Sequence, residues 1–281
     1  DLAEKGENVL ILTFNRLLAN NIRYGLGNPE NPHVSTYHSI AKSFIDRHEN
    51  EWWASNSKND DFWDLEVPVK FAEAIDSAEE KYDSIIVDEG QDLKEIWYEN
   101  LEKLIKPDGG YYVFLDQDQD IFGAYKQVSV NRRLFQFPLE ENCRNTVEII
   151  NTLKTYINKD IKFFADSVPG MLVRVIEYQN DTEQMNQIKS EWLNLVENEG
   201  ISPDKIVLMM NSDRRSSCLS GVKKFGKYRI ESLHGRTGRL DPRNVNYTSI
   251  RMFKGLETDV VFIIDTDKVL NPDHKLLYTQ A

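Results

Sequence analysis

The sequence predicts an α/β protein in which parallel β-sheets are flanked by helices. Short apolar runs alternate with helix-like segments along the chain, as they do in the βαβ units of a doubly wound sheet. One run, residues 84–87, is mostly apolar, which is typical of a strand buried on both faces of a parallel sheet. A length of 281 residues with 40% hydrophobic and 11% aromatic side chains is enough for two domains with separate cores.

In the first part of the chain, apolar runs predict strands and the segments between them predict helices. The expected strands are residues 9–14, 34–36, 84–88 and 111–115. The expected helices are residues 16–24, 38–48, 69–78 and 92–105. An acidic, tryptophan-rich stretch at residues 51–66 interrupts the alternation, and Asp108-Gly109-Gly110 predicts a turn before the last strand.

A second unit is expected to begin near Phe137-Pro138. Its expected helices are residues 145–158 and 181–199, and Gly200 and Pro203 are the stop signals after the second helix. Its expected strands are residues 171–178, 205–210, 246–250 and 259–265. The pattern therefore predicts two lobes, residues 1–137 and residues 138–281, packed across a cleft.

The net charge and the cysteines indicate which partners and which cellular compartment to expect. The net charge of −12, from 46 acidic and 34 basic residues, argues against nonspecific coating of nucleic acid but allows a local basic groove. Cys143 and Cys218 form neither a CxxC pair nor a disulfide framework, so we expect a reduced, cytoplasmic setting. No apolar run is long enough to cross a bilayer.

Three acids cluster directly after the central apolar run, in the sequence Asp88-Glu89-Gly90-Gln91-Asp92. Open α/β sheets place their chemistry at the carboxyl ends of strands. Two adjacent carboxylates at that position can hold Mg²⁺ and orient a water molecule. The alternative is a polar strand-to-helix turn in which Asp92 is the helix N-cap.

This segment resembles the Walker B segment (motif II) of the UvrD/Rep-like superfamily 1 helicases. The Gly between Glu and Gln resembles the branch that is often fused to a nuclease-related (NERD) domain. Other segments that resemble the family's motifs follow in the family's order. The resemblance implies two RecA-like lobes of the P-loop NTPase type, with ATP and Mg²⁺ as cofactors. It also implies an ATP-dependent helicase or translocase that moves along single-stranded DNA, or RNA, by ATP hydrolysis.

Two segments of the first lobe resemble nucleic-acid-binding motifs. Residues 9–16 resemble motif Ia, where Thr13 and Asn15 would supply hydrogen-bonding groups to the backbone of a single strand. Alternatively, Asn15 caps the next helix. Residues 34–39 resemble motif Ib, which implies nucleic-acid contacts for Thr36, Tyr37 and His38. An exposed Tyr37 ring would stack on a base, a contact worth ~1–3 kcal/mol, whereas the alternative is a core or capping role.

The resemblance implies roles at the bound nucleotide for four further residues. Asp88 would hold Mg²⁺ and Glu89 would act as general base. Residues 115–122 resemble motif III, in which Gln119 would sense the γ-phosphate; the alternative is an acidic surface loop. Residues 139–146 resemble motif IV, in which Arg144 would act as an arginine finger; the alternative is a surface salt bridge.

Residues 249–257 resemble motif V, and their Lys254-Gly255-Leu256-Glu257 core matches the family closely. Lys254 and Gly255 would lie at the nucleotide, because Gly permits close backbone approach to phosphate. Glu257 would contact the ribose. Ser249 and Arg251 would face the nucleic acid. Departures from the family pattern are Leu115, Phe122, Cys143, Ser249 and Arg251.

The sequence holds no convincing P-loop, which the family places one helix before motif Ia. Because residues 1–6 resemble the end of that helix and Asp1 is not a natural start, we expect the P-loop upstream of Asp1. The stretch Gly221 to Tyr228 has P-loop spacing, but Tyr228 cannot be the Mg²⁺-binding hydroxyl and no strand precedes the stretch. Residues 276–281 resemble the start of motif VI, without its arginine. The isolated chain is therefore expected to be inactive.

Two alternatives to a motor remain open. The departures at Leu115, Cys143, Ser249 and Arg251 allow a catalytically degenerate, helicase-like module that binds nucleic acid or protein. A metal-dependent nuclease built on Asp88, Glu89 and Asp92 is a further alternative, although it lacks additional ligands. A basic loop at residues 234–243 would make nucleic-acid binding salt-dependent, or would be a solvated loop. A nuclease-related domain upstream in the same polypeptide is expected only from the family branch.

Overall fold

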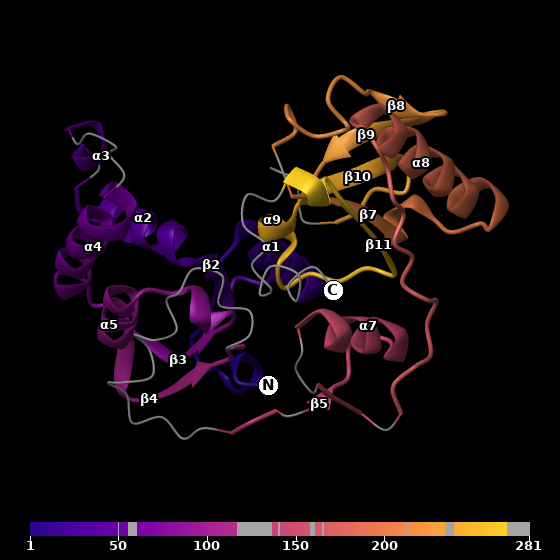
Figure 1. Cartoon of the computed structure of the whole chain (residues 1–281). Helices are drawn as coiled ribbons and strands as arrows, with labels where there is room; N and C mark the ends of the chain where they lie inside the picture. Colours follow the sequence, from indigo (N-terminus) through magenta and orange to yellow (C-terminus); the bar gives the residue numbers. More distant parts are fainter. Residues whose placement is uncertain are drawn as a thin grey trace. The chain divides into compact units, whose positions relative to one another are not determined.

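The computed structural model describes residues 1–49, 51–55, 61–116, 137–139, 141–157, 161–164, 166–211, 213–233 and 239–268. The chain divides into two compact units, Asp1–Arg132 and Arg133–Ala281. Figure 1 shows an α/β architecture in both units, with strands accompanied by helices. Among the described residues, no helix combines the length and the apolar character that a bilayer span requires.

The first unit contains a four-stranded sheet in which every neighbouring pair is parallel. Its strands, in chain order, are β1 (Val9–Thr13), β2 (His33–Thr36), β3 (Tyr82–Val87) and β4 (Ile105–Val113). Their order across the sheet is β2-β1-β3-β4. The strand that carries the acids, β3, therefore lies between β1 and β4, as the apolar run at residues 84–87 predicts.

Helices cover one face of this sheet and part of the other. The helices are α1 (Arg16–Gly25), α2 (Tyr37–His48), α3 (Trp52–Ser55), α4 (Val67–Asp76) and α5 (Glu95–Leu104). Shorter helical segments are η1 (Ala3–Lys5), η2 (Phe62–Glu66) and η3 (Gly90–Asp92). Residues of α2, α4 and α5 form one core cluster with Leu10 and Ile85 of the sheet. Each fully buried aliphatic side chain of this core stabilises the fold by ~1.5–3 kcal/mol.

The opposite face of the sheet is less covered near β4. Ile86 lies beside Tyr112 in the sheet register and faces away from the core cluster of Ile85. Tyr112 is 46% exposed and Phe114, just after β4, is 55% exposed. This side of the sheet therefore presents an apolar surface, which we call the β4 face (Tyr112 and Phe114).

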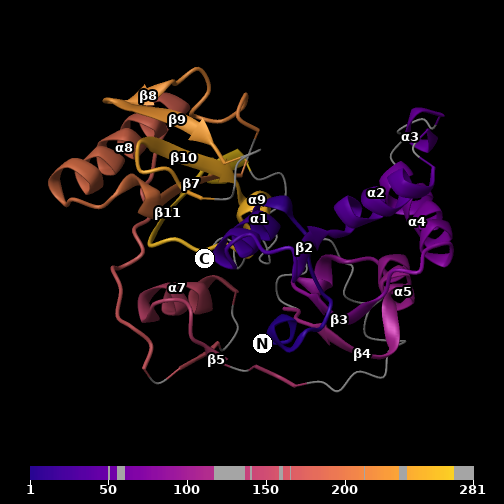
Figure 2. The same ribbon diagram turned by 180° about the vertical axis from the view of Figure 1, so that it is seen from behind.

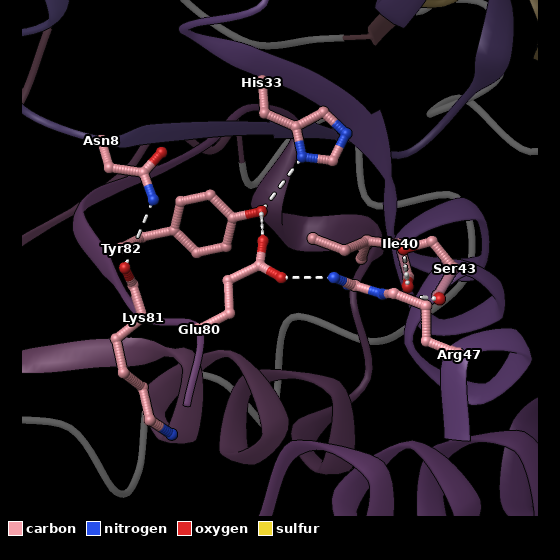
Figure 3. A network of polar contacts seen from close by, with 8 residues as sticks. All are labelled: Asn8, His33, Ile40, Ser43, Arg47, Glu80, Lys81 and Tyr82. Carbon is pink, nitrogen blue, oxygen red and sulfur yellow. Dashed lines mark hydrogen bonds and ion pairs between the residues drawn. The ribbon is translucent and has the colours of Figure 1, made fainter. Parts of the chain in front are cut away.

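A polar network ties the amino-terminal ends of β2 and β3 to α2 (Figure 3). Nδ1 of His33 lies 3.0 Å from the hydroxyl of Tyr82, which donates to Glu80 at 3.3 Å. Arg47 at the end of α2 pairs with the other oxygen of Glu80 at 2.6 Å. This network is at the opposite end of the strands from the acids of the Walker B-like segment.

The second unit contains a five-stranded sheet. Its strands are β7 (Ile206–Met210), β8 (Lys224–Phe225), β9 (Tyr228–Ser232), β10 (Asn244–Ser249) and β11 (Val260–Ile264). Their order is β11-β7-β10-β9-β8, and only the β8–β9 pair is antiparallel. A separate pair, β5 (Glu141–Asn142) and β6 (Lys162–Phe163), is parallel.

Helices of the second unit include α7 (Val147–Ile157), α8 (Asp181–Leu193) with its extension η5 (Asn194–Asn198), and α9 (Ile250–Phe253). Short turns are η6 (Pro203–Lys205) and η7 (Thr266–Lys268). Figure 2 shows α8 lying along the five-stranded sheet. Trp192 of α8 is 0% exposed and packs edge-on against Phe225 and Tyr228, so the β8–β9 hairpin belongs to the core of this sheet.

Some sequence expectations were wrong. Residues 171–178 form no strand, and their apolar side chains are exposed, as at Leu172 (79%) and Val175 (73%). Side-chain contacts hold this segment instead, because Arg174 pairs with Glu191 and Tyr178 donates to Asp267.

The expected turn at residues 108–110 lies inside β4. Ile105 is opposite Tyr82 and Gly110 is opposite Ser84, so the residues between Ile105 and Gly110 bulge out of register. The stretch with P-loop spacing, residues 221–228, contains β8 and the turn of the β8–β9 hairpin. It has no strand–loop–helix geometry, which agrees with the expectation that it is a chance match.

Candidate functional site

Polar residues gather where the strands of the first sheet end. Because β1, β3 and β4 are parallel neighbours, their carboxyl ends meet at one edge. The backbone N–H of Asp88 donates to the carbonyl of Leu12 in β1 at 2.8 Å. The N–H of Phe114 donates to the carbonyl of Val87 at 2.8 Å. The start of the acidic segment is therefore fixed to both neighbouring strands.

The chain reverses sharply at Glu89. Its φ of 56° and ψ of 42° lie in the left-handed region, which a residue with a Cβ adopts at a cost of ~1–3 kcal/mol. Oδ1 of Asp88 accepts the N–H of Glu89 at 3.0 Å and so supports the turn. Both carboxylates are half-buried at the carboxyl edge of the sheet. Strain of this kind is common at functional sites, where the surrounding structure imposes it.

Gly90 is required by packing. Its N–H donates to the carbonyl of Phe114 at 2.8 Å, and its carbonyl accepts the hydroxyl of Tyr98 at 2.7 Å. A Cβ at this position would lie 2.6 Å from the Tyr98 hydroxyl and 2.6 Å from Cγ1 of Val113. No side chain fits that space unless the neighbours shift.

Gln91 is the residue of this edge whose importance the sequence did not reveal. It is 0% exposed, and its amide joins the side chain of Glu89 to the backbone of Asp116. The motif itself was the available signal, because a Gln two residues after Glu89 can bond to its carboxylate.

Asp92 is not the N-cap that the alternative interpretation expected. The residue is buried (3% exposed) within η3, and α5 begins only at Glu95, with Lys94 at the cap position. The physical reason is the extra turn of η3, which separates the acids from the helix.

The motif Ia segment forms the junction of β1 and α1. Oδ1 of Asn15 accepts the N–H of Leu18 at 2.8 Å, so the capping alternative for Asn15 is confirmed. Thr13 is fully buried, and its hydroxyl donates to the carbonyl of Asn15. Arg16, the first residue of α1, is exposed. Its guanidinium is therefore the accessible charge of this segment.

The motif Ib segment is built differently from the expectation. Thr36 caps α2 through the N–H of Ser39 at 3.3 Å. Tyr37 is only 2% exposed; its ring stacks on Trp97 and its hydroxyl accepts from Asn100 at 2.7 Å. The expectation of an exposed stacking ring at Tyr37 was wrong, because the ring belongs to the core beneath α2 and α5.

His38 lies between aromatic rings at the same end of the sheet. Nε2 of His38 is 3.3 Å from the carbonyl oxygen of Trp63, and its ring meets Trp63 and Trp97 edge-on. Burial lowers the pKa of His38. Trp63 is 39% exposed, so it is the accessible aromatic ring beside His38. The tryptophan-rich stretch was its sequence signal.

In the second unit, the motif IV and motif V segments are brought together. Oδ1 of Asn142 accepts the N–H groups of Arg144 (3.2 Å) and Asn145 (3.0 Å), which shapes the turn that carries Arg144. Nε of Arg144 lies 3.2 Å from Oε2 of Glu257. Both side chains are exposed, by 64% and 72%, so this is a surface ion pair, as the alternative for Arg144 expected.

The rest of the motif V segment surrounds the short helix α9. Oγ of Ser249 accepts the N–H of Met252 at 3.4 Å and caps the helix. Arg251 is exposed, whereas Lys254 is buried (4% exposed). Gly255 has a φ of 79°, a left-handed conformation that favours glycine.

Other predicted positions lie outside the described residues. They are Gln119, the end of the motif III segment, residues 234–238 of the basic loop, and residues 276–281. Within the described ranges, no three His, Cys, Asp or Glu side chains form a group that could hold a metal ion. No family model matches the chain, and no curated protein matches it significantly.

Proposed function

We propose that this chain is the core of an ATP-dependent helicase or translocase that moves along single-stranded DNA, similar to the UvrD/Rep-like superfamily 1 motors. In this proposal both units are RecA-like lobes of the P-loop NTPase type, and ATP binds between them. The observation that carries it is the turn at Asp88 and Glu89. Two carboxylates stand at the carboxyl end of β3, between β1 and β4, where α/β sheets bind nucleotides.

The donor set at this edge suits Mg²⁺ carried by a nucleotide. Mg²⁺ prefers oxygen ligands and usually takes one or two carboxylates together with substrate phosphates, so a cage of protein ligands is not needed. Asp88 would hold the ion, and Glu89 would accept a proton from the attacking water. When bound, Mg²⁺ would neutralise phosphate charge. At the strained turn the two carboxylates have different partners, since Asp88 accepts the N–H of Glu89 and Glu89 accepts the side chain of Gln91.

The second unit would contribute positive charge. Arg144 is exposed, and a guanidinium stabilises charge on a transferring phosphoryl group. Its present partner, Glu257, would release it for phosphate and contact the ribose instead. Lys254 and Gly255 would line the same nucleotide. In the proposed motor, these roles require residues of both units to act on the same nucleotide.

Single-stranded nucleic acid would lie along the first sheet's carboxyl edge and motif V. Thr13, Asn15 and Thr36 are used in local capping and turn contacts, so their side chains support the shape of that edge. Exposed Arg16 and Arg251 are the charges that phosphates would meet. His38 and Ser249 would border this path.

The proposal is tested by ATP hydrolysis in the polypeptide that the gene encodes. We expect hydrolysis stimulated by single-stranded DNA, with a fall of ~10²–10⁴-fold in kcat for Glu89→Gln. Glu99→Gln, the same change at an exposed position of α5, is the matched control and should leave kcat unchanged. A kcat that Glu89→Gln leaves unchanged would contradict the role of Glu89 as general base.

A degenerate binding module is the second candidate. The pairing of Arg144 with Glu257 favours it, since each group already satisfies the other. DNA binding without any ATP hydrolysis by the gene-encoded protein would support this module and reject the motor.

A further inference from the structure

Gln91 has a side chain to which the proposed roles give no function. It is fully buried, and both ends of its amide are bonded. Nε2 donates to Oε2 of Glu89 at 2.7 Å, and Oε1 accepts the backbone N–H of Asp116 at 2.9 Å. Breaking either bond would leave a buried polar atom without water, which costs ~1–3 kcal/mol. The amide therefore has one preferred orientation.

The bond to Asp116 continues the ladder between β3 and β4 beyond the end of β3. The N–H of Phe114 donates to the carbonyl of Val87 at 2.8 Å. Along an extended strand, N–H groups two residues apart point to the same side, so the N–H of Asp116 faces the same neighbour. The chain has already turned away at Glu89, and the side-chain oxygen of Gln91 takes the place of the missing carbonyl.

We propose that Gln91 is a positioning residue that couples the carboxylate of Glu89 to the segment leaving β4. The inference rests on the proposed function and adds a regulatory contact within the same site. A shift of the backbone at Asp116 pulls the amide of Gln91, and the amide in turn redirects the carboxylate that accepts the proton. The position of the Asp116 backbone, just after β4, thereby controls when Glu89 is aligned for hydrolysis.

Two substitutions distinguish the contributions of the two hydrogen bonds of Gln91. Gln91→Glu keeps an acceptor oxygen for the N–H of Asp116 but removes the donor to Glu89. Gln91→Met removes both the acceptor and the donor while it keeps a similar length. If Gln91→Met does not fold, Gln91→Asn replaces it, because its shorter side chain cannot reach both partners.

The first measurement is amide hydrogen exchange of Asp116 by NMR in the 281-residue chain. Exchange should be at least about tenfold faster in Gln91→Met than in wild type, since one hydrogen bond is lost. Gln91→Glu should keep the protection. Unchanged exchange in Gln91→Met would overturn the inference, whether or not the protein hydrolyses ATP.

The second measurement is steady-state ATP hydrolysis by the gene-encoded polypeptide. Both Gln91 variants should lower kcat about 10- to 100-fold, as loss of a contact that orients a catalytic group does. The KM for ATP should change less than about twofold, a split that general destabilisation does not produce. Gln184→Met is the control, because Gln184 is also buried (4% exposed) but lies in the second unit.

The outcomes are distinguishable. A kcat of Gln91→Glu equal to that of wild type would overturn the inference and leave the motor intact. A wild-type protein without ATP hydrolysis would overturn the proposed function, and with it the regulatory role of Gln91. The exchange experiment would still decide whether Gln91 bridges the two segments.

Discussion

At the scale of single residues, Gly90 shows how tightly the acidic turn is packed. Its backbone passes between Tyr98 and Val113, where a Cβ would lie 2.6 Å from each. The residue identity is thus imposed by neighbours from β4 and α5, while the strained φ falls on Glu89 beside it. The two restraints together fix the backbone of the turn that carries Asp88 and Glu89.

Gly90→Ala should lower the free energy of unfolding by ~1–3 kcal/mol, because the added methyl group overpacks this site. Urea denaturation followed by tryptophan fluorescence measures the change. Gly25→Ala is the matched control: it lies at the end of α1 with nothing within 4 Å of the new Cβ, so stability should stay the same or rise. Equal effects at the two glycines would contradict the packing argument.

His33 makes the stability of the first unit depend on pH. Burial, with a contribution from Arg23, lowers the pKa of His33 below its value in the unfolded chain. The unfolded state therefore binds protons first as the pH falls, so stability is present above pH ~6.5 and is lost below it. His33 lies in the network of Figure 3, where its Nδ1 is 3.0 Å from the Tyr82 hydroxyl.

We expect the free energy of unfolding to fall between pH 7.5 and pH 5.5 in wild type, and to fall less in His33→Gln. The double variant His33→Gln/His38→Gln should be flatter still, since burial lowers the pKa of His38 as well. Urea titrations at both pH values provide the comparison. The same slope in all three proteins would show that these histidines do not carry the pH dependence.

At the scale of secondary-structure elements, Asn15 illustrates a residue with two candidate roles. The structure assigns it the N-cap of α1, and the role at nucleic acid stays a prediction. The two roles respond differently to a carboxylate, because Asp caps a helix as well as Asn does but repels phosphate.

Asn15→Ala should therefore cost ~0.5–2 kcal/mol of stability, whereas Asn15→Asp should cost little. Fluorescence anisotropy with a labelled single strand should show weaker binding for Asn15→Asp at low salt. Asn180→Asp, at the N-cap of α8, is the control for an added charge at a helix cap. Binding that is unchanged in Asn15→Asp would leave Asn15 with its capping role alone.

Elements that follow from local pattern were predictable from sequence. The strands β1, β3, β7 and β11 come from apolar runs. The helix α8, together with its extension η5, ends at Asn198, just before the stop signals Gly200 and Pro203. The strand expected at residues 171–178 was wrong, since an apolar pattern does not specify which sheet edge will receive it. The β8–β9 hairpin was missed because β8 has only two residues and β9 is not a continuous apolar run.

The candidate site was only partly predictable for a similar reason. The position of Asp88 and Glu89 after a buried strand follows from the sequence alone. The burial of Tyr37 depends on Trp97 and Asn100, which are distant in the chain. The link from Gln91 to Asp116 likewise depends on the neighbouring strand, and the pairing of Arg144 with Glu257 depends on the fold of the second unit.

At the scale of the whole molecule, a motor requires each unit to complete the other's site. Arg144 tests this requirement, since its ion pair with Glu257 is exposed and contributes ~0–1 kcal/mol to stability. An arginine finger, in contrast, accelerates phosphoryl transfer by ~10³–10⁵-fold. A substitution of Arg144 should therefore strongly lower the rate of ATP hydrolysis but hardly change the free energy of unfolding.

Arg144→Ala should reduce kcat for ATP in the gene-encoded protein by about 10³-fold or more, with a melting temperature close to that of wild type. Arg174→Ala is the matched control, because Arg174 also forms an exposed pair, with Glu191, in the same unit. Similar activity in the two variants would exclude a catalytic role for Arg144.

The β4 face has a practical consequence for anyone who purifies the chain by itself. Its exposed rings of Tyr112 and Phe114 form an apolar surface, and exposed apolar surface promotes self-association. Light scattering should therefore increase with protein concentration, and a Tyr112→Lys/Phe114→Lys variant should remain monodisperse. Self-association of the folded protein, rather than misfolding, would then limit the yield of the 281-residue chain.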